Sequence, residues 1–382
     1  MKNLWDDAQA SQYKTDLELR VYTSNLLGQS DELVLHGGGN TSVKSMVDGE
    51  EILYVKGSGW DLVSIKSEGF APVKMATLLE MAKMKNITDT DMVSGQKAAM
   101  IDSSAPNPSV EAILHALIPF KVVDHTHADA VVTISNSKNG KTHISNIFPN
   151  FLIVPYVMPG FILAQKIYEM TQEGFDWDTC EGIILHNHGI FTFDDDAKKS
   201  YDKMIDAVSK AEKFLAKNAE VIFDDIESME FDIDDLAIDK FRHVNQTPLA
   251  LHYASQANLR QKVTRGVLTP EHIIRTKRVP LVVENWDIED ALRHYRVDYE
   301  TYFNAYKTDE MMLDSRPKYA VIKDFGVVTF GKTQKEADVI NDVVEHTMMA
   351  VLRADKLGGY QSISIPDCFD MEYWELEQAK LK

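Results

Sequence analysis

Two short apolar runs in this sequence each end in a pair of histidines separated by one residue. The first run ends in His125 and His127, and the second ends in His186 and His188. Short apolar runs are typical of buried strands, in which alternate side chains point to the same face. The two imidazoles of each pair are therefore expected side by side, where they could chelate a divalent cation such as Zn²⁺.

A metal site is not the only interpretation of these histidines, because a histidine pair can instead make hydrogen bonds within a polar part of the core. However, five of the 12 histidines lie near the expected ends of elements: His115, His125, His127, His186 and His188. This clustering favours a metal site with three histidine ligands and open coordination positions, as catalytic metals require.

A carboxylate lies close to one of these histidines in the segment that begins at Pro108. Ser109 is a suitable helix N-cap, and Glu111 is expected in the first helical turn, where the helix dipole stabilises a negative charge. Glu111 could act as a general base and then as an acid, although its position is also ordinary helix chemistry. His115 is expected on the same helix face and could orient a metal ligand or simply pack in the core.

Two glycine-rich turns could hold an anion through their backbone N–H groups. One contains Gly37 to Gly39 followed by Asn40, and the other contains Ser58 between two glycines, the second of which is Gly59. Each could also be a simple hairpin connection. Neither matches a dinucleotide-binding or P-loop pattern, so a nucleotide is not expected.

Strands alternate with helices along the chain, which predicts a layered α/β or α+β architecture. We expect a first domain over residues 1–223, an acidic linker or solvated helix over 224–244, and a second folded unit over 245–382. Helices are predicted over 16–27, 75–85, 110–117 and 196–218, and strands over 51–55, 121–127 and 182–188.

The second unit contains a segment that is weakly similar in sequence to a segment of the first. Residues 184–193 align with residues 321–330, with Gly, Thr and Phe in common, and a helical pattern follows both segments. Lys323 and Phe325 stand where the first segment has its histidines, so a second copy would lack the imidazoles. Two explanations of this similarity are open: a degenerate repeat and a chance resemblance.

Composition excludes some classes of partner. The net charge of −19 disfavours a nucleic acid or an anionic membrane as the main partner. The N-terminus has no signal-peptide pattern, the most apolar stretch is too short to span a bilayer, and the two cysteines are far apart in the sequence. We therefore expect a cytoplasmic protein without disulfides.

The order of these motifs resembles the class II aldolase/adducin family over about residues 15–220. The matching segments are Gly39 to Ser42, Gly57 to Gly59, Ser109 to Glu111, His125 to His127, and His188 with Gly189. The tail from Asp370 onward resembles the segment that follows the aldolase portion in bifunctional rhamnulose-1-phosphate aldolase/dehydrogenase proteins.

This resemblance implies a three-layer αβα fold with a largely antiparallel sheet, followed by a related C-terminal α/β domain. It implies that His125, His127 and His188 bind Zn²⁺ or another divalent metal and that Glu111 is the catalytic acid/base. Apart from the resemblance, His115 and His186 are candidates for supporting positions. The resemblance also implies a substrate-phosphate site formed by Asn40, Ser58, Gly59 and Ser109. Val110 departs from the family pattern, which has a second serine there, and this weakens the phosphate assignment.

The activity implied is metal-dependent cleavage of a ketose, most simply a ketose 1-phosphate, through a metal-stabilised enediolate in a homo-oligomeric lyase. An epimerase or decarboxylase of the same fold and a non-catalytic, adducin-like binding protein are the alternatives. Basic residues of the second unit (Arg275, Lys277, Arg278 and Arg316) could bind a sugar acid or phosphate, but we expect them at the surface.

Overall fold

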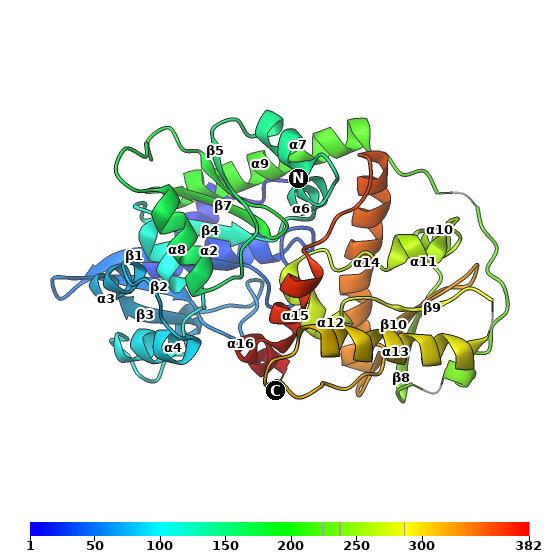
Figure 1. Ribbon diagram of the computed structural model, residues 1–382. Helices are drawn as coiled ribbons and strands as arrows, with labels where there is room; N and C mark the ends of the chain where they lie inside the picture. The colour runs from blue at the N-terminus through cyan, green and yellow to red at the C-terminus, as the bar shows by residue number, and fades with distance from the viewer. Residues whose placement is uncertain (224, 237, 286, 382) are drawn as a thin grey trace. The chain divides into compact units, whose positions relative to one another are not determined.

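The computed structural model describes residues 1–223, 225–236, 238–285 and 287–381. The chain divides into two compact units (Figure 1). The first contains residues 1–132 and 141–213, and the second contains residues 133–140 and 214–382. This division differs from the expected boundary at residue 223, because the end of the long helix α9 and a short internal segment belong to the second unit.

The first unit is built around a seven-stranded sheet with the strand order β3-β2-β1-β4-β7-β6-β5. All neighbouring strands are antiparallel except β5 and β6, which confirms the largely antiparallel sheet. The strands are β1 (Asn40–Val47), β2 (Glu50–Lys56), β3 (Phe70–Lys74), β4 (Val122–Thr126), β5 (Phe151–Val154), β6 (Gly182–Leu185) and β7 (Gly189–Asp194).

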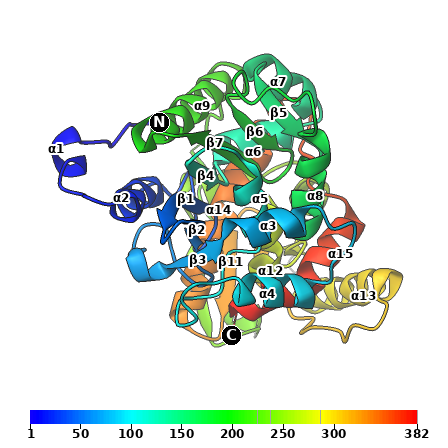
Figure 2. The same ribbon diagram turned by 90° about the vertical axis from the view of Figure 1, so that its left-hand side faces the viewer.

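Helices cover both faces of this sheet (Figure 2). Helices α3, α5 and α8 pack together on one face, whereas α2 and α9 contact the other. The helices of this part of the chain are α1 (Asp7–Ala10), α2 (Asp16–Gly28), α3 (Met75–Ala82), α4 (Asp89–Ala98), α5 (Ala112–Leu117), α6 (Asp129–Ser135), α7 (Gly140–Ile147), α8 (Phe161–Met170) and α9 (Ala197–Asn218).

Local sequence explains where several of these elements begin. Helix α2 starts with a capping box, in which the Thr15 side chain accepts from the Glu18 backbone and Glu18 accepts from the Thr15 backbone. Helix α5 begins at Ala112, later than predicted, so Glu111 is the cap residue rather than part of the first turn. Its preceding loop is held by a hydrogen bond from the Glu111 N–H to the Ser109 hydroxyl, 3.3 Å long.

The second unit contains a four-stranded sheet with the order β8-β11-β10-β9. Its strands are β8 (Phe241–Asn245), β9 (Leu281–Val283), β10 (Tyr319–Ile322) and β11 (Gly326–Gly331). Its helices are α10 (Pro248–Ala254), α11 (Leu259–Val263), α12 (Ile273–Thr276), α13 (Ile288–Tyr306), α14 (Gln334–Lys356), α15 (Ile365–Tyr373) and α16 (Glu375–Gln378).

The two sheets share a strand arrangement at the two segments of similar sequence, residues 184–193 and 321–330. In each, a parallel pair (β5 with β6, β9 with β10) is followed by an antiparallel hairpin and a long helix. The hairpin turns contain Asn187 and Asp324 at aligned positions, both with positive φ. The hydroxyls of Thr192 and Thr329 also make the same contact, each donating to the backbone carbonyl eight residues later. These correspondences favour a repeat over chance similarity.

The acidic segment is more ordered than a simple linker. Strand β8 begins at Phe241, inside the residues 224–244 expected as a linker, and pairs with β11. Residues 224 and 237 of this segment lie outside the described residues. Part of the expected linker therefore belongs to the sheet of the second unit.

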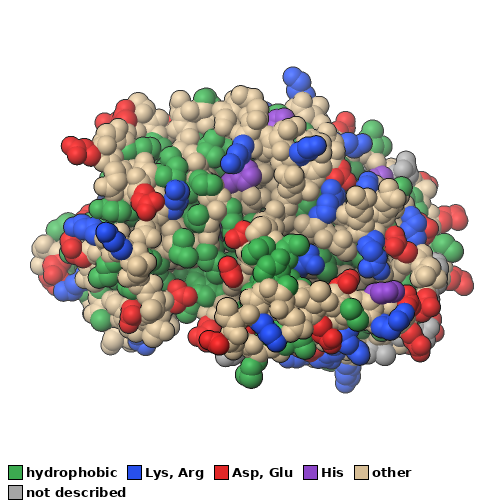
Figure 3. Space-filling model, viewed as in Figure 1, with side chains coloured by type: hydrophobic (Ala, Val, Ile, Leu, Met, Phe, Trp, Pro, Cys, Tyr) green, Lys and Arg blue, Asp and Glu red, His purple; other side chains and the backbone are tan. Residues whose placement is uncertain are grey.

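The surface carries charges of both signs. On the face shown in Figure 3, Lys and Arg side chains lie among Asp and Glu side chains, so positive and negative charges are interspersed there. Both cysteines are buried and free. Among the described residues, none of the helices combines the length and hydrophobicity that a membrane crossing requires.

Candidate metal centre and active site

Three histidines from two distant parts of the sequence meet at one end of the strand pair β4–β7. His125 lies in β4, His127 follows that strand directly, and His188 precedes β7 in the turn after β6. The Nε2 atoms of His125 and His127 are 3.1 Å apart, and the His188 ring centre lies 5.2 Å from His125 and 5.0 Å from His127. One ring nitrogen from each of the three lies within 4.8 Å of the others.

Glycines make this close approach possible. A Cβ at Gly189 would lie 2.4 Å from the Thr126 carbonyl oxygen and 2.9 Å from the His125 ring. A Cβ at Gly38 would lie 2.9 Å from the Leu35 carbonyl oxygen and 3.2 Å from His127 Nδ1. Side chains at these two positions would force the backbone away from the histidines.

The buried Glu111 carboxylate faces the histidines from the start of α5. Its Oε2 lies 3.6 Å from His125 Nε2, and its Oε1 lies 4.0 Å from His188 Nε2. Oε1 is buried and accepts no hydrogen bond from the described residues. An unsatisfied carboxylate oxygen beside three converging imidazole nitrogens fits a divalent cation, because imidazole and carboxylate are both good ligands for Zn²⁺.

A hydrogen-bonded chain behind the carboxylate sets its orientation. The Asn40 amide donates a 2.7 Å hydrogen bond to Glu111 Oε2, and the Asn40 carbonyl faces His115 Nε2. The opposite ring nitrogen of His115 lies 2.8 Å from the Ser42 hydroxyl. Because Asn40 uses its NH₂ group on Glu111, its carbonyl must accept from His115, so we assign the His115 proton to Nε2 and make Nδ1 an acceptor.

His115 is well suited to remain neutral in this chain. The ring is fully buried, and burial, with a further contribution from nearby His125, holds its pKa well below the usual value. A neutral ring donates from one nitrogen and accepts at the other, as the chain requires. The His115 ring is therefore linked to the Glu111 carboxylate through Asn40, and a role in supporting the site stays a prediction.

A buried ion pair fixes the strand that carries His125. Side chains alternate along β4, so Asp124 points to the opposite face, where its Oδ1 lies 2.6 Å from Arg20 Nη2 of α2. Both side chains have no exposed surface. Asp124 also accepts a 2.5 Å hydrogen bond from Ser200 of α9. The two residues are 104 positions apart, and no local sequence pattern links them, so this pair could not be predicted from the sequence.

The predicted phosphate-binding segments are neighbours in the structure. The Ser58 N–H donates to the Asn107 carbonyl at 2.9 Å, and the Ser109 N–H donates to the Lys56 carbonyl at 3.1 Å. The buried Lys56 also donates from Nζ to the Gly37 carbonyl, 3.1 Å away, which connects the two glycine turns. Ser58 and Gly59 are exposed.

Two details differ from the sequence-based expectations. The Asn40 amide contacts Glu111 in this structure, whereas the family resemblance implied a contact with substrate phosphate. Strand β6 ends at Leu185, so His186 and His188 lie in a turn and do not share a strand face. The Nδ1 atom of His186 is hydrogen-bonded to Asn187 at 2.6 Å, and His186 is outside the histidine cluster.

Two family models match this chain. The class II aldolase and adducin N-terminal domain matches residues 19–215, and the class II aldolase second domain matches residues 229–381. The first match includes the three histidines, Glu111 and both glycine turns.

Individual relatives match one or both parts. The uncharacterized oxidoreductase YuxG of Bacillus subtilis (strain 168) is 29% identical over the whole chain, which spans 60% of the length of that protein. The N-terminal class II aldolase domain of a conserved Thermoplasma acidophilum protein is 40% identical, with a TM-score of 0.51, and covers 56% of this chain and 99% of its own. L-fuculose-1-phosphate aldolase from Thermus thermophilus is 15% identical, with a TM-score of 0.35, over 55% of this chain and 95% of its own.

Proposed function

Because this chain belongs to the class II aldolase and adducin family, we propose that it is a metal-dependent aldolase that cleaves a ketose, most simply a ketose 1-phosphate. The observation that carries the proposal is the buried Glu111 carboxylate, which faces three converging histidines. A non-catalytic binding protein would have no need for this arrangement, because an unsatisfied carboxylate oxygen in the core lowers stability.

His125, His127 and His188 would hold the divalent cation, which we propose to be Zn²⁺. The chemistry that such a cation supplies when bound is polarisation of the substrate carbonyl and stabilisation of negative charge on the adjacent oxygens.

Glu111 is placed to move the proton. In the cleavage direction the C3–C4 bond breaks, its electron pair stays on C3, and the C4 hydroxyl loses its proton as the aldehyde forms. The Glu111 carboxylate would accept that proton as a general base and then donate it to C3 as an acid, so the proton count balances. The Asn40 amide, which donates to Oε2, would keep Oε1 directed toward the reacting carbon.

The substrate phosphate would bind at the glycine turns. The segment around Ser58 and Gly59 is exposed and adjoins Ser109, so it offers hydroxyl and backbone donors to an anion. Lys56, next to the same turn, would add a positive charge. We propose that the protein works as a homo-oligomer on a small sugar phosphate.

A product assay tests the proposal. The protein, loaded with Zn²⁺, Co²⁺ or Mn²⁺, is incubated with a panel of ketose 1-phosphates, and released dihydroxyacetone phosphate is measured by coupled NADH oxidation. We expect release with at least one sugar and none after chelation of the metal. Recovery of an epimerised sugar or of CO₂, without cleavage into two fragments, would contradict an aldolase, and no turnover of any sugar with a loaded metal would favour a binding protein.

A further inference from the structure

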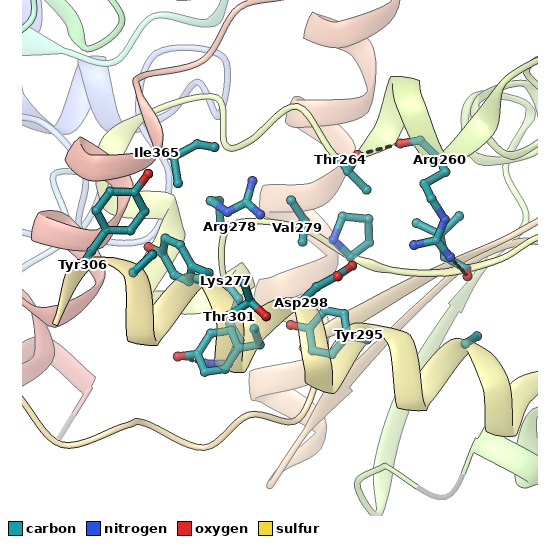
Figure 4. A pocket seen from close by; sticks show the side chains of 16 residues that line it. Arg260, Thr264, Lys277, Arg278, Val279, Tyr295, Asp298, Thr301, Tyr306 and Ile365 are labelled. Atoms are coloured by element: carbon teal, nitrogen blue, oxygen red, sulfur yellow. Dashed lines mark hydrogen bonds between the residues drawn. The ribbon is translucent and has the colours of Figure 1, made fainter.

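The second unit contains a cavity that the proposed aldolase chemistry does not use. Its volume is about 460 Å³, which is in the range of small-molecule sites. It lies between the segment 277–282 and helix α13, and its lining combines aliphatic residues with four tyrosines of α13 (Figure 4). The tyrosines are Tyr295, Tyr299, Tyr302 and Tyr306.

Two adjacent basic residues of the lining have different surroundings. Lys277, expected at the surface, is instead buried, and its Nζ lies 3.1 Å from the buried Glu372 carboxylate and 2.9 Å from the Tyr299 hydroxyl. Burial lowers the pKa of Lys277, while Glu372 opposes that shift. The Lys277 charge is therefore compensated within the protein.

The Arg278 charge has no such compensation. Within the parts of the chain that the structure describes, its guanidinium makes no ion pair and no hydrogen bond, and its Nε is buried without a partner. Its Cζ lies 5.2 Å from the centre of the Tyr302 ring, a cation–π contact. Figure 4 places Arg278 in the middle of the lining, with Tyr306 and Ile365 to one side and Thr264 and Arg260 to the other. A half-buried guanidinium with unused donors is a strong site for a carboxylate or phosphate.

Buried hydroxyls next to this cation also lack hydrogen bonds. Tyr295 and Tyr302 are each 6% exposed; the Tyr295 hydroxyl is not hydrogen-bonded to a described residue, and the Tyr302 hydroxyl lies near the Glu372 carboxylate without a hydrogen bond of normal geometry. The pKa of Tyr302 is raised, first by burial and then by the nearby Glu372 carboxylate, so this hydroxyl keeps its proton. Buried hydroxyls without partners are costly, and a ligand oxygen would relieve that cost.

A carboxylate in the lining further restricts the chemistry of the ligand. Asp298, an exposed residue of α13, has no ion pair or hydrogen bond among the described residues, and it can accept from ligand hydroxyls. Arg260, by contrast, already forms an ion pair with Glu284 and donates a hydrogen bond to the Val282 carbonyl. The faces of tyrosine rings suit the C–H surface of a sugar-like skeleton.

We propose that this cavity binds a small polyhydroxylated anion, a sugar acid or a sugar phosphate. Arg278 holds the acidic group, the Tyr295 hydroxyl completes its coordination, and Asp298 accepts from the hydroxyls. This site is separate from the histidine cluster and does not depend on the aldolase proposal.

Isothermal titration calorimetry tests the proposal with gluconate, sorbitol 6-phosphate, inorganic phosphate and neutral sorbitol. We expect gluconate or sorbitol 6-phosphate to bind with a Kd of about 1 mM or lower. Whichever of the two binds more tightly shows whether the site prefers a carboxylate or a phosphate. Sorbitol should bind at least about tenfold more weakly than either. If inorganic phosphate binds as tightly as sorbitol 6-phosphate, the polyol part of the proposal is wrong.

Two variants test whether the anion binds at Arg278. Arg278→Gln should weaken binding at least about tenfold. Arg293→Gln is the matched control, because Arg293 lies on α13 but is 70% exposed and paired with Asp290. Equal affinity of the wild type and Arg278→Gln, or no detectable binding of any anion at 10 mM (about ten times the expected Kd), overturns the proposal.

Tyr295→Phe provides a readout that does not depend on Arg278→Gln folding correctly. Because the hydroxyl has no partner among the described residues, its removal should leave the melting temperature unchanged or higher while binding weakens several-fold. A variant that instead melts lower and binds as well as the wild type would show that the hydroxyl supports the fold and not a ligand.

Discussion

The side-chain amide of Asn40 donates a 2.7 Å hydrogen bond to Glu111, the carboxylate that faces the histidine cluster. Asn40 is the first residue of β1, and Glu111 immediately precedes α5, so this contact connects the sheet to the helix layer above it. It gives Asn40 a role in orienting the proposed acid/base, in addition to the phosphate contact that the family resemblance implies.

Replacing Asn40 with Ala should separate these two roles. If the amide mainly orients Glu111, kcat should fall at least about tenfold while KM for the ketose phosphate changes little. If the amide mainly binds phosphate, KM should rise instead. Steady-state kinetics, with metal content measured on the same samples, distinguishes the two results.

Glu111→Gln should retain the metal and lose most turnover. The substitution keeps the size of the side chain but removes the group that carries the proton, so we expect kcat to fall by about 10²–10⁴-fold. Kinetics and elemental analysis are measured together. Undiminished turnover, or loss of the metal along with activity, would refute the proposed role of Glu111.

His127→Ala should abolish stoichiometric metal binding, because two imidazoles remain from a three-histidine site. His186→Ala is a matched control, since this histidine lies in the same turn as His188 but outside the cluster. Elemental analysis after dialysis should detect about one equivalent of metal in the wild type and the control. Equal metal content in His127→Ala would show that the cation is bound elsewhere.

Asp124→Asn should strongly destabilise the first unit. It leaves the fully buried Arg20 charge uncompensated, and breaking such a pair costs about 3–5 kcal/mol of unfolding free energy. Urea denaturation measures this change. Glu80→Gln, which breaks an exposed pair with Lys83, should have no measurable effect, and an equally small effect of Asp124→Asn would mean that the buried pair is not needed for stability.

Stability should also depend on pH through Lys44. Burial lowers the pKa of Lys44 to about 8 from its usual value of 10.5, and its Nζ donates to the carbonyls of Ile118 and Phe120. At pH values between these two pKa values, the unfolded chain binds more protons than the folded chain. The unfolding free energy should therefore rise with pH over this range, by at most about 3 kcal/mol. Below the lower of these two pKa values both states are protonated, and this contribution is constant.

The comparison with Lys44→Met isolates that effect from other titrating groups. Chemical denaturation at several pH values between about 7 and 10.5 should give a free-energy difference, wild type minus variant, that increases with pH. A difference that stays constant over this range would mean that the pKa of Lys44 is not lowered by folding.

Much of the architecture is encoded in short stretches of sequence. Apolar periodicity predicted α2, β2, β4 and α9, because burial of one face depends on residues within a few positions of each other. The family resemblance carried by the motif order also predicted that His125, His127 and His188 come together, whereas the supporting role suggested for His186 stays a prediction.

Contacts between distant segments could not be predicted in this way. Asn40 and Glu111 are 71 residues apart, and Arg20 and Asp124 are 104 apart, so no local periodicity connects them. The unequal surroundings of Lys277 and Arg278 likewise depend on whether Glu372, near the C-terminus, reaches one of them. Sequence patterns record which side chains a chain offers, whereas their partners, burial and pKa values arise only when folding brings remote segments together.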